Sequence, residues 1–312
     1  MANKSLDGAL IKKAHVKQQW TESQITDMLA CMDPEMGYLY FSSKFFYIQH
    51  SVKGKLLFDP YEYQKGLLDS YHNNRFNVNM LPRQSGKTTC ASAYLLWYAM
   101  FHPDQTILVA AHKYTGAQEI MQRIRYGYEL CPDFLRAGVI SYNKGSIEFE
   151  NGSRIVSQTT TGTTGRGMSI SLLYCDEFAY VQPNIAVEFW TSISPTLATG
   201  GRAIITSTPN SDEDQFAVIW KESQDKFDSY GNASGLTTGR NGFFGYKAEW
   251  WDHPDRDEKW KQDEIGRIGI EKFRREYNCY AHNTIITLMD ENGNIFDISI
   301  GDFFNQSMNI RY

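Results

Sequence analysis

The sequence predicts an α/β fold built on a doubly wound, mainly parallel sheet with helices on both faces. Two observations indicate this fold class. Short apolar runs typical of strands alternate along the chain with longer segments of helical spacing, and strands separated by helices are typical of parallel sheets. Hydrophobic residues also make up 42% of the 312 residues, which is sufficient for one or two domains with a sizeable core.

The expected elements follow one another in a regular order. The first part of the chain predicts a helix at 15–32, a short strand at 53–58 and an amphipathic helix at 61–73. Next come three strand–helix units and a fourth strand, with strands at 76–80, 106–111, 170–175 and 202–206 and helices at 88–101, 115–130 and 186–197. Residues 224–245 are polar and rich in glycine, so we expect an excursion on the surface.

Composition limits the classes of function. The net charge of −5 argues against a uniformly basic DNA coat, although a local DNA-binding face is compatible with it. No apolar window of about 18 residues and no signal-peptide core is present, so we expect no membrane span and a location in the cytoplasm. None of the five cysteines forms a Cys-x-x-Cys pair, and four are expected to be core thiols: Cys31, Cys90, Cys131 and Cys175.

A phosphate-binding loop is predicted between the strand at 76–80 and the helix that follows it. The loop sequence is Leu81-Pro82-Arg83-Gln84-Ser85-Gly86-Lys87-Thr88. Backbone N–H groups at a helix N-terminus hold phosphate oxygens, Lys87 would reach the β- and γ-phosphates, and Thr88 would bind Mg²⁺. Leu81 stands where the usual pattern has its first glycine. The alternative is an ordinary exposed lysine at a helix start.

A second motif follows at the end of the strand at 170–175. Asp176 can hold Mg²⁺ through water, and Glu177 can polarise the attacking water. Two adjacent carboxylates are usually a solvated turn, but after a buried type of strand and downstream of a phosphate loop they predict a Walker B pair. The two motifs together predict a P-loop NTPase of the RecA/ASCE-like class, with ATP and Mg²⁺ as its ligands.

Further residues are candidates for the same site. Thr206, Ser207 and Thr208 end the strand at 202–206 and would couple hydrolysis to movement, although hydroxyls there are also common turn residues. Arg83 would stabilise charge in the transition state as an arginine finger in cis. Arg166 would do similar work or contact DNA, or it is a plain loop cation. The predicted nucleotide-binding set also includes Tyr63, Gln64, Gln84, Ser85, Gly86 and Thr89, with Gln64 reading the adenine edge unless it is an exposed helix residue.

The order of these motifs closely resembles the ATPase domain of large terminases of tailed phages of the myovirus type. The matching motifs are Y-Q, P-R-Q-S-G-K-T-T, A-A-H-K, G-R-G-M-S, L-Y-C-D-E-F-A and I-I-T-S-T-P-N, and the resemblance covers roughly residues 15–278. It implies a ring-shaped homo-oligomeric motor that packages double-stranded DNA into a procapsid, docked on the portal protein and assisted by a small terminase subunit. The expected location is the cytoplasm of the infected bacterial host, and transiently the procapsid.

The resemblance also implies a division into domains. We expect an N-terminal helical extension at 1–50, the P-loop ATPase core at 51–210 and a small subdomain at 211–278 that leads toward a nuclease. The family's nuclease domain is RNase H-like and is expected to lie outside this chain, so DNA cleavage is not expected of the chain itself.

From Ala281 on, short β-branched runs flank a turn-like D-E-N-G-N and predict the start of an all-β module. Together with Cys279, residues 279–312 resemble the N-terminal block of an intein, a self-splicing Hint domain. Cys279 would then attack the carbonyl of Asn278 and form a thioester. The later intein blocks do not follow by residue 312, so we expect half of a split intein with a complementary C-intein–nuclease polypeptide. The alternatives are a core thiol in a terminase linker and a terminase sequence that is cut short, without splicing.

Two other functions compete with the packaging motor. A helicase-like nucleic-acid-dependent ATPase needs a second RecA-like domain, which does not fit into 211–312. A catalytically silent binding scaffold would not need the complete set of Lys87, Thr88, Asp176 and Glu177. An ATPase assay separates the scaffold from the motor.

Overall fold

The computed structural model describes residues 10–211, 213–227, 233, 235–278, 285–289 and 293–299. Within them, one central sheet has the strand order β10-β3-β9-β8-β4-β7-β6-β5. Its strands are β3 (Phe76–Met80), β4 (Thr106–Ala111), β5 (Val139–Tyr142), β6 (Ser146–Phe149), β7 (Arg154–Thr159), β8 (Leu172–Asp176), β9 (Arg202–Ser207) and β10 (Phe244–Lys247). All neighbours from β10 to β7 pair in parallel, which confirms the predicted mainly parallel sheet.

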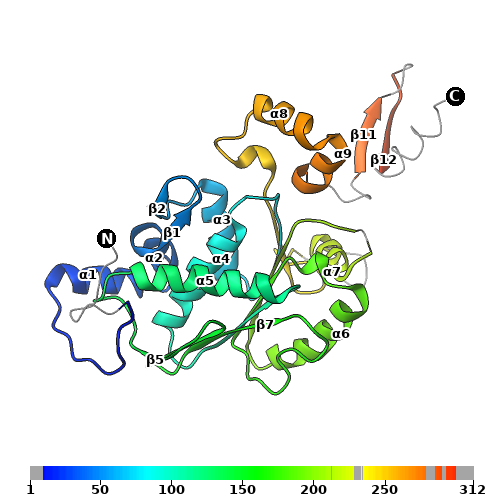
Figure 1. The fold of residues 1–312 in the computed structure, drawn as a ribbon. Coiled ribbons are helices and arrows are strands. Elements are labelled where there is room, and N and C mark those ends of the chain that lie inside the picture. Colours follow the sequence, from blue (N-terminus) through cyan, green and yellow to red (C-terminus); the bar gives the residue numbers. More distant parts are fainter. Residues whose placement is uncertain are drawn as a thin grey trace.

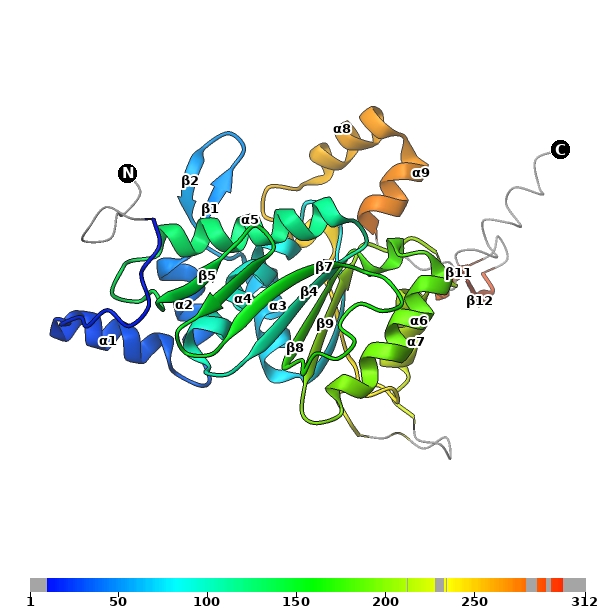
Figure 2. The same ribbon diagram turned by 60° about the horizontal axis from the view of Figure 1, so that its bottom comes forward.

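Helices cover both faces of this sheet (Figures 1 and 2). The first layer contains α2 (Gly37–Phe45), α3 (Glu62–Asn73), α4 (Lys87–Phe101) and α5 (Tyr114–Leu130), and the second contains α6 (Pro183–Ile193) and α7 (Gln215–Gln224). Side chains of a strand alternate between its two faces. Accordingly, Ile107 and Val109 of β4 lie in the core of the first layer, and Leu108 and Ala110 lie in that of the second. The doubly wound arrangement is confirmed.

The N-terminal helix is shorter than predicted. α1 spans Glu22–Cys31, whereas helical spacing indicated a start near residue 15. Thr21 caps the helix: its hydroxyl accepts a hydrogen bond from the N–H of Gln24, and the Gln24 side chain accepts from the N–H of Thr21. Such a capping box fixes a helix start, so the apolar spacing before it does not become helical.

An antiparallel part of the sheet was not predicted. β5 and β6 form a hairpin, and β6 pairs antiparallel with β7. At the other edge, β10 pairs in parallel with β3 and takes in Phe244 and Gly245, which belong to the glycine-rich stretch expected to be a surface excursion. The expectation was wrong for these two residues. Phe243 is buried and stacks on Phe76, so packing and strand pairing override the local sequence signal.

A small cluster of helices follows β10. It contains the 3₁₀ turn Trp250–Asp252, α8 (Glu258–Ile268), α9 (Ile270–Phe273) and a π-helical turn, Arg274–Asn278. We call residues 250–278 the lid. Its own core consists of Trp250, Phe273 and Tyr277, with Trp260 packed against them. The lid stands at the top of Figure 1. By contrast α7, which precedes β10, packs on the sheet through Phe216 and Ile219.

Two hairpins complete the described elements. β1 (Tyr47–His50) pairs with β2 (Gly54–Leu57), which confirms the predicted strand at 53–58. β11 (Ile285–Met289) pairs antiparallel with β12 (Ile295–Ser299), as the β-branched runs in the C-terminal segment predicted.

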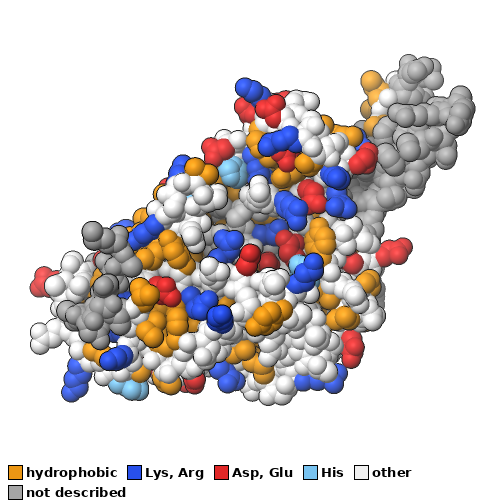
Figure 3. Space-filling model, viewed as in Figure 1, with side chains coloured by type: hydrophobic (Ala, Val, Ile, Leu, Met, Phe, Trp, Pro, Cys, Tyr) orange, Lys and Arg blue, Asp and Glu red, His pale blue; other side chains and the backbone are white. Residues whose placement is uncertain are grey.

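Burial and charge agree with the composition. Cys31, Cys90, Cys131 and Cys175 are buried free thiols, as predicted. Acidic and basic side chains are interspersed over the face shown in Figure 3. In the part of the chain that the structure describes, no helix is long and apolar enough to cross a lipid bilayer.

Candidate nucleotide site

The predicted phosphate loop joins β3 to α4 as a tight turn. Gly86 is the N-cap of α4 and has a φ of 78°, in the left-handed region that favours glycine. A Cβ at this position would lie 2.4 Å from Nε2 of Gln64, so a larger residue would strain the backbone and push on α3. Gln84 also has a positive φ, of 54°. The loop leaves the N-terminus of α4 facing an open pocket, the geometry that binds phosphate.

This pocket brings half of the predicted site residues together. It has a volume of about 320 Å³ and is lined by Arg83, Gln84, Ser85, Gly86, Lys87, Thr88, Thr89, Arg123 and Glu177. The first seven come from the loop and the first turn of α4, and Glu177 follows β8. Parallel strands end at the same edge of a sheet, which is why residues after β3 and β8 meet here.

Lys87 and Glu177 form the centre of the site. The lysine side chain is only 7% exposed, and its Nζ lies 2.8 Å from Oε1 of Glu177. Glu177 itself has a φ of 50°, a conformation that non-glycine residues rarely adopt and that often marks functional sites. Burial would raise the pKa of Glu177, but the Lys87 ammonium and the hydrogen bonds from Ser207 and Thr208 bring that pKa below its usual value.

The second oxygen of Glu177 ties Walker B to the end of β9. Oε2 accepts hydrogen bonds from Oγ of Ser207 at 3.3 Å, from N of Thr208 at 3.2 Å and from Oγ1 of Thr208 at 3.4 Å. One carboxylate therefore bridges the phosphate-loop lysine and two of the hydroxyl residues expected to couple hydrolysis to movement. The third, Thr206, is buried within β9.

Asp176 is a buried carboxylate whose environment disfavours its negative charge when no cation is nearby. The Tyr174 hydroxyl donates to its Oδ1 at 2.8 Å. Burial, then repulsion from Glu177, raises the pKa of Asp176 to about 6. Among the described residues no group of three or more His, Cys, Asp or Glu side chains gathers to hold a metal. The buried carboxylate of Asp176 nevertheless fits Mg²⁺, which usually keeps its waters and binds through one or two protein oxygens and substrate phosphates.

The raised pKa of Asp176 leads to a prediction about stability. The folded protein binds this proton more tightly than the unfolded chain, so stability falls as pH rises from about 4 through about 6. Asp176→Asn should therefore raise the free energy of unfolding of the nucleotide-free protein at pH 8 by about 1–3 kcal/mol, although it removes the metal ligand. Denaturant unfolding at pH 8 and pH 4 checks this. Equal destabilisation at both values would contradict it.

Three candidates hold the loop in place. The Tyr63 hydroxyl and the Gln64 Nε2 both donate to the carbonyl oxygen of Ser85, at 2.7 and 2.9 Å. Gln64 Oε1 accepts from the N–H of Tyr61. The Gln64 side chain is buried. Both its amide oxygen and its amide nitrogen form hydrogen bonds, and the bond to Ser85 stabilises the conformation of the loop. Arg83 is 63% exposed, and its Nε lies 3.2 Å from Oε2 of Glu276 in the lid.

Arg166 lies away from this pocket. Its side chain is 57% exposed, and its nearest acidic partner, Glu188 on α6, is 4.0 Å away. It is not among the residues that line the phosphate-loop pocket of this chain. Cys279 lies outside the described residues.

Sequence analysis missed the contacts that the lid makes with the loop. Nη2 of Arg256 donates to the carbonyl oxygens of Arg83 at 3.1 Å and Gln84 at 3.0 Å, and the Arg83 N–H donates to the carbonyl of Glu276 at 2.9 Å. The Arg256 guanidinium lies over the rings of Trp260 and Tyr277. No local pattern could have revealed these pairs, since about 170 residues separate Arg256 from the loop.

A family model now decides to which family this chain belongs. The model for the N-terminal part of the large terminase subunit, T4-like-virus type, matches residues 78–301. The chain belongs to the large terminase family. The match extends beyond residue 278, where the resemblance seen in the motifs ended, and includes the hairpin β11–β12.

Solved terminase structures share the fold. An ATPase-domain mutant of the Thermus phage P74-26 large terminase is 21% identical with a TM-score of 0.57, covering 72% of this chain and 95% of that one. The large terminase of bacteriophage HK97 is 16% identical with a TM-score of 0.61, covering 82% of this chain and 57% of that one. A large terminase from another thermophilic bacteriophage, solved with ADP, is 12% identical with a TM-score of 0.51, covering 70% and 52%.

Proposed function

We propose that this terminase chain is the ATPase motor that couples Mg²⁺-dependent ATP hydrolysis to movement of double-stranded DNA into a procapsid. The observation that carries the proposal is the single carboxylate of Glu177, which contacts Lys87 on one side and Thr208 on the other. A group that links the phosphate loop to a neighbouring strand can convert the state of the nucleotide into movement of that strand.

The contacts support a defined sequence of events. Before nucleotide binds, Lys87 is paired with Glu177. The terminal phosphate of ATP competes for the Lys87 ammonium, because lysines of such loops reach the β- and γ-phosphates. Glu177, released from Lys87, then polarises the attacking water as a general base. Bound Mg²⁺ neutralises phosphate charge, and Thr88 and Asp176 are the residues that would hold it.

This change of partner at Glu177 would also couple ATP hydrolysis to movement of the protein. When Glu177 turns to the water, its hydrogen bonds from Ser207 and Thr208 must change, so the end of β9 senses whether a γ-phosphate is present. A second route runs through the lid, which holds Arg83 by an ion pair to Glu276. As an arginine finger in cis, Arg83 would exchange Glu276 for the phosphate and so loosen the lid from the loop.

The partners that we propose are those implied by membership of the large terminase family. The motor would work as a ring of identical subunits on the portal protein of the procapsid, with a small terminase subunit and double-stranded DNA, in the cytoplasm of the infected host. Arg166, exposed and weakly paired, is available for DNA or for a neighbouring subunit. The family match favours this function over a helicase-like ATPase.

DNA packaging itself is the experiment for this proposal. Procapsids, portal protein, small subunit, linear DNA and ATP are combined with this terminase, and the DNA protected from nuclease digestion is measured. We expect protection with the unchanged chain and none with Glu177→Gln as the matched control. Equal protection with both proteins would mean that hydrolysis at this site does not drive the DNA.

Protein splicing is a separate proposal that depends on the sequence around Cys279. A thiol there can accept the acyl group of Asn278 as a thioester, and the hairpin β11–β12 is compatible with the β-rich start of an intein. The family match across 279–301 leaves a terminase linker as the alternative.

Substitution of Cys279 distinguishes protein splicing from an ordinary terminase linker. Mixed with a complementary C-intein polypeptide, the chain should yield a ligated product that contains residues 1–278 and lacks 279–312. Cys279→Ala should abolish this product and leave ATP hydrolysis unchanged, because the two sites share no residue. Gel electrophoresis and mass measurement check both. A ligated product that still forms with Cys279→Ala, or that retains 279–312, would exclude splicing.

A further inference from the structure

Arg123 is a cation of the phosphate-loop pocket that no sequence motif indicates. It lies on α5, and it lines the pocket together with Lys87, Thr88 and Glu177. α5 follows β4, the strand next to β8 in the sheet. Arg123 therefore reaches the pocket from α5, whereas the other lining residues belong to the loop, to the first turn of α4 and to the position after β8.

The other arginines around the loop are already engaged. Arg83 is paired with Glu276, and Arg256 donates to loop carbonyls. Within the described residues, Arg123 has no hydrogen-bonded or ion-paired partner. An unpaired guanidinium beside a phosphate loop is suited to a phosphate oxygen, because its planar set of donors matches that geometry.

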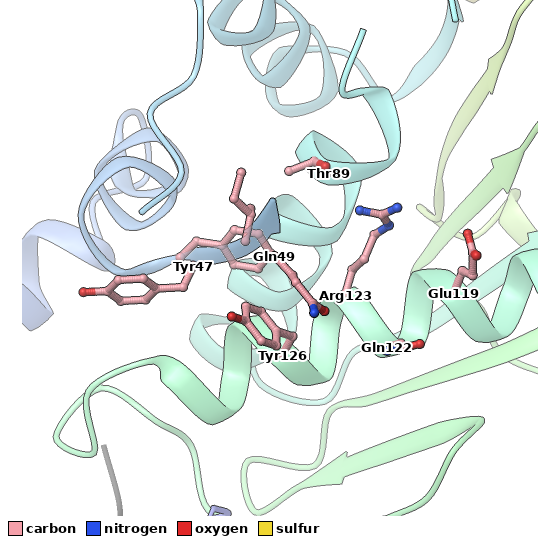
Figure 4. Close-up of a pocket in the computed structure, with 9 residues that line it drawn as sticks. Tyr47, Gln49, Thr89, Glu119, Gln122, Arg123 and Tyr126 are labelled. Atoms are coloured by element: carbon pink, nitrogen blue, oxygen red, sulfur yellow. The ribbon is translucent and has the colours of Figure 1, made fainter. Parts of the chain in front are cut away.

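The surroundings of Arg123 leave its guanidinium accessible. Figure 4 shows the side chain rising from α5 toward the first turn of α4, where Thr89 lies. A second pocket of about 190 Å³ adjoins it, lined in part by Tyr47, Gln49 and Tyr126. Arg123 and Thr89 line both pockets, so the guanidinium lies at the boundary between the phosphate site and this neighbouring space.

From these placements we infer that Arg123 binds the terminal phosphate of ATP, in cis, from α5. The loop N–H groups and Lys87 would hold the β-phosphate, and Lys87 would also reach the γ-phosphate. The γ-phosphate must lie toward Glu177, since that residue acts on the water that attacks it, and Arg123 lines the same pocket as Glu177.

This inference rests on the proposed ATPase function and adds a prediction that the function alone does not make. Arg123→Ala should weaken binding of a non-hydrolysable ATP analogue by about tenfold or more, since a hydrogen bond to a charged group is typically worth that much. Binding of ADP should stay within about twofold, because the γ-phosphate is absent. Arg123→Lys should restore part of the analogue affinity.

The measurement is titration calorimetry of both nucleotides with Mg²⁺ present. Gln122→Ala is the matched control, because Gln122 is exposed on the same helix and lines only the neighbouring pocket. A thermal unfolding curve verifies that each variant is folded, and Arg123→Lys keeps the test decisive if the alanine variant is not.

Each outcome has a distinct meaning. If the unchanged chain binds both nucleotides and Arg123→Ala binds them equally well, Arg123 does not touch the phosphate and the inference fails while the proposed function stands. An equal loss for ATP analogue and ADP would overturn the assignment to the terminal phosphate. If the unchanged chain binds neither nucleotide, the proposed function fails, and the inference fails with it.

Discussion

Replacing Glu177 with Gln is expected to lower the rate of ATP hydrolysis by about 10²-fold or more while ATP still binds. Glutamine keeps the size of the side chain and loses the carboxylate that we propose polarises the attacking water. In the nucleotide-free protein that carboxylate also holds Lys87 at 2.8 Å. The variant therefore leaves Lys87 free for phosphate, and ATP should bind at least as tightly as before.

Two measurements check this prediction. Phosphate release under single-turnover conditions gives the hydrolysis rate, and calorimetry gives the affinity for ATP. Glu188→Gln serves as a control, because Glu188 is an exposed carboxylate on α6 outside the pocket. Normal hydrolysis by Glu177→Gln would show that another group activates the water.

Replacing Lys87 with Ala is expected to remove both ATP binding and hydrolysis. The ammonium is the buried cation at the N-terminus of α4, and a charge-assisted contact with phosphate is lost with it. The change also leaves Glu177 buried without its cation, so the pKa of Glu177 should rise above its present lowered value. A partly protonated Glu177 is a poorer base, which adds to the loss of turnover.

The matched control for Lys87→Ala is Lys53→Ala, since Lys53 is exposed in the turn between β1 and β2. Filter binding of radiolabelled ATP and phosphate release are measured for both variants. Full hydrolysis by a folded Lys87→Ala protein would place the nucleotide elsewhere in the molecule.

The sequence predicted the centre of the site because its signals are local. Lys87 and Thr88 open the helix that follows a strand and a short loop, and Asp176 ends a strand with Glu177 directly after it. In a parallel sheet these two strand ends must meet at one edge. The pairing of Lys87 with Glu177, which ties the two motifs to each other, required only that both strands belong to the same sheet.

The rest of the site depends on tertiary packing and has no local signature. Arg123 is one of several polar residues on an amphipathic helix, and only the packing of α5 against α4 brings it to the pocket. Arg256 and Glu276 reach the loop because aromatic residues of the lid pack together. Likewise, β10 is a strand because its backbone pairs with β3. The glycine-rich sequence that precedes it did not indicate a strand.

Two interpretations change once the geometry is known. Gln64 was expected to face adenine, but its amide donates to Ser85 and accepts from Tyr61, so supporting the loop becomes its first role. Arg166 was expected to stabilise charge or contact DNA, or to be a plain loop cation, and it does not line the phosphate-loop pocket. A role for Arg166 would therefore require DNA or a second subunit.

The rate of phosphate release from ATP by the intact chain, measured with and without Mg²⁺, tests the central claim most directly. The account predicts hydrolysis that requires Mg²⁺, that is lost in Lys87→Ala and Glu177→Gln, and that persists in the two control variants. Absence of hydrolysis by the unchanged, folded chain with Mg²⁺ and double-stranded DNA, or equal rates in all variants, would contradict it.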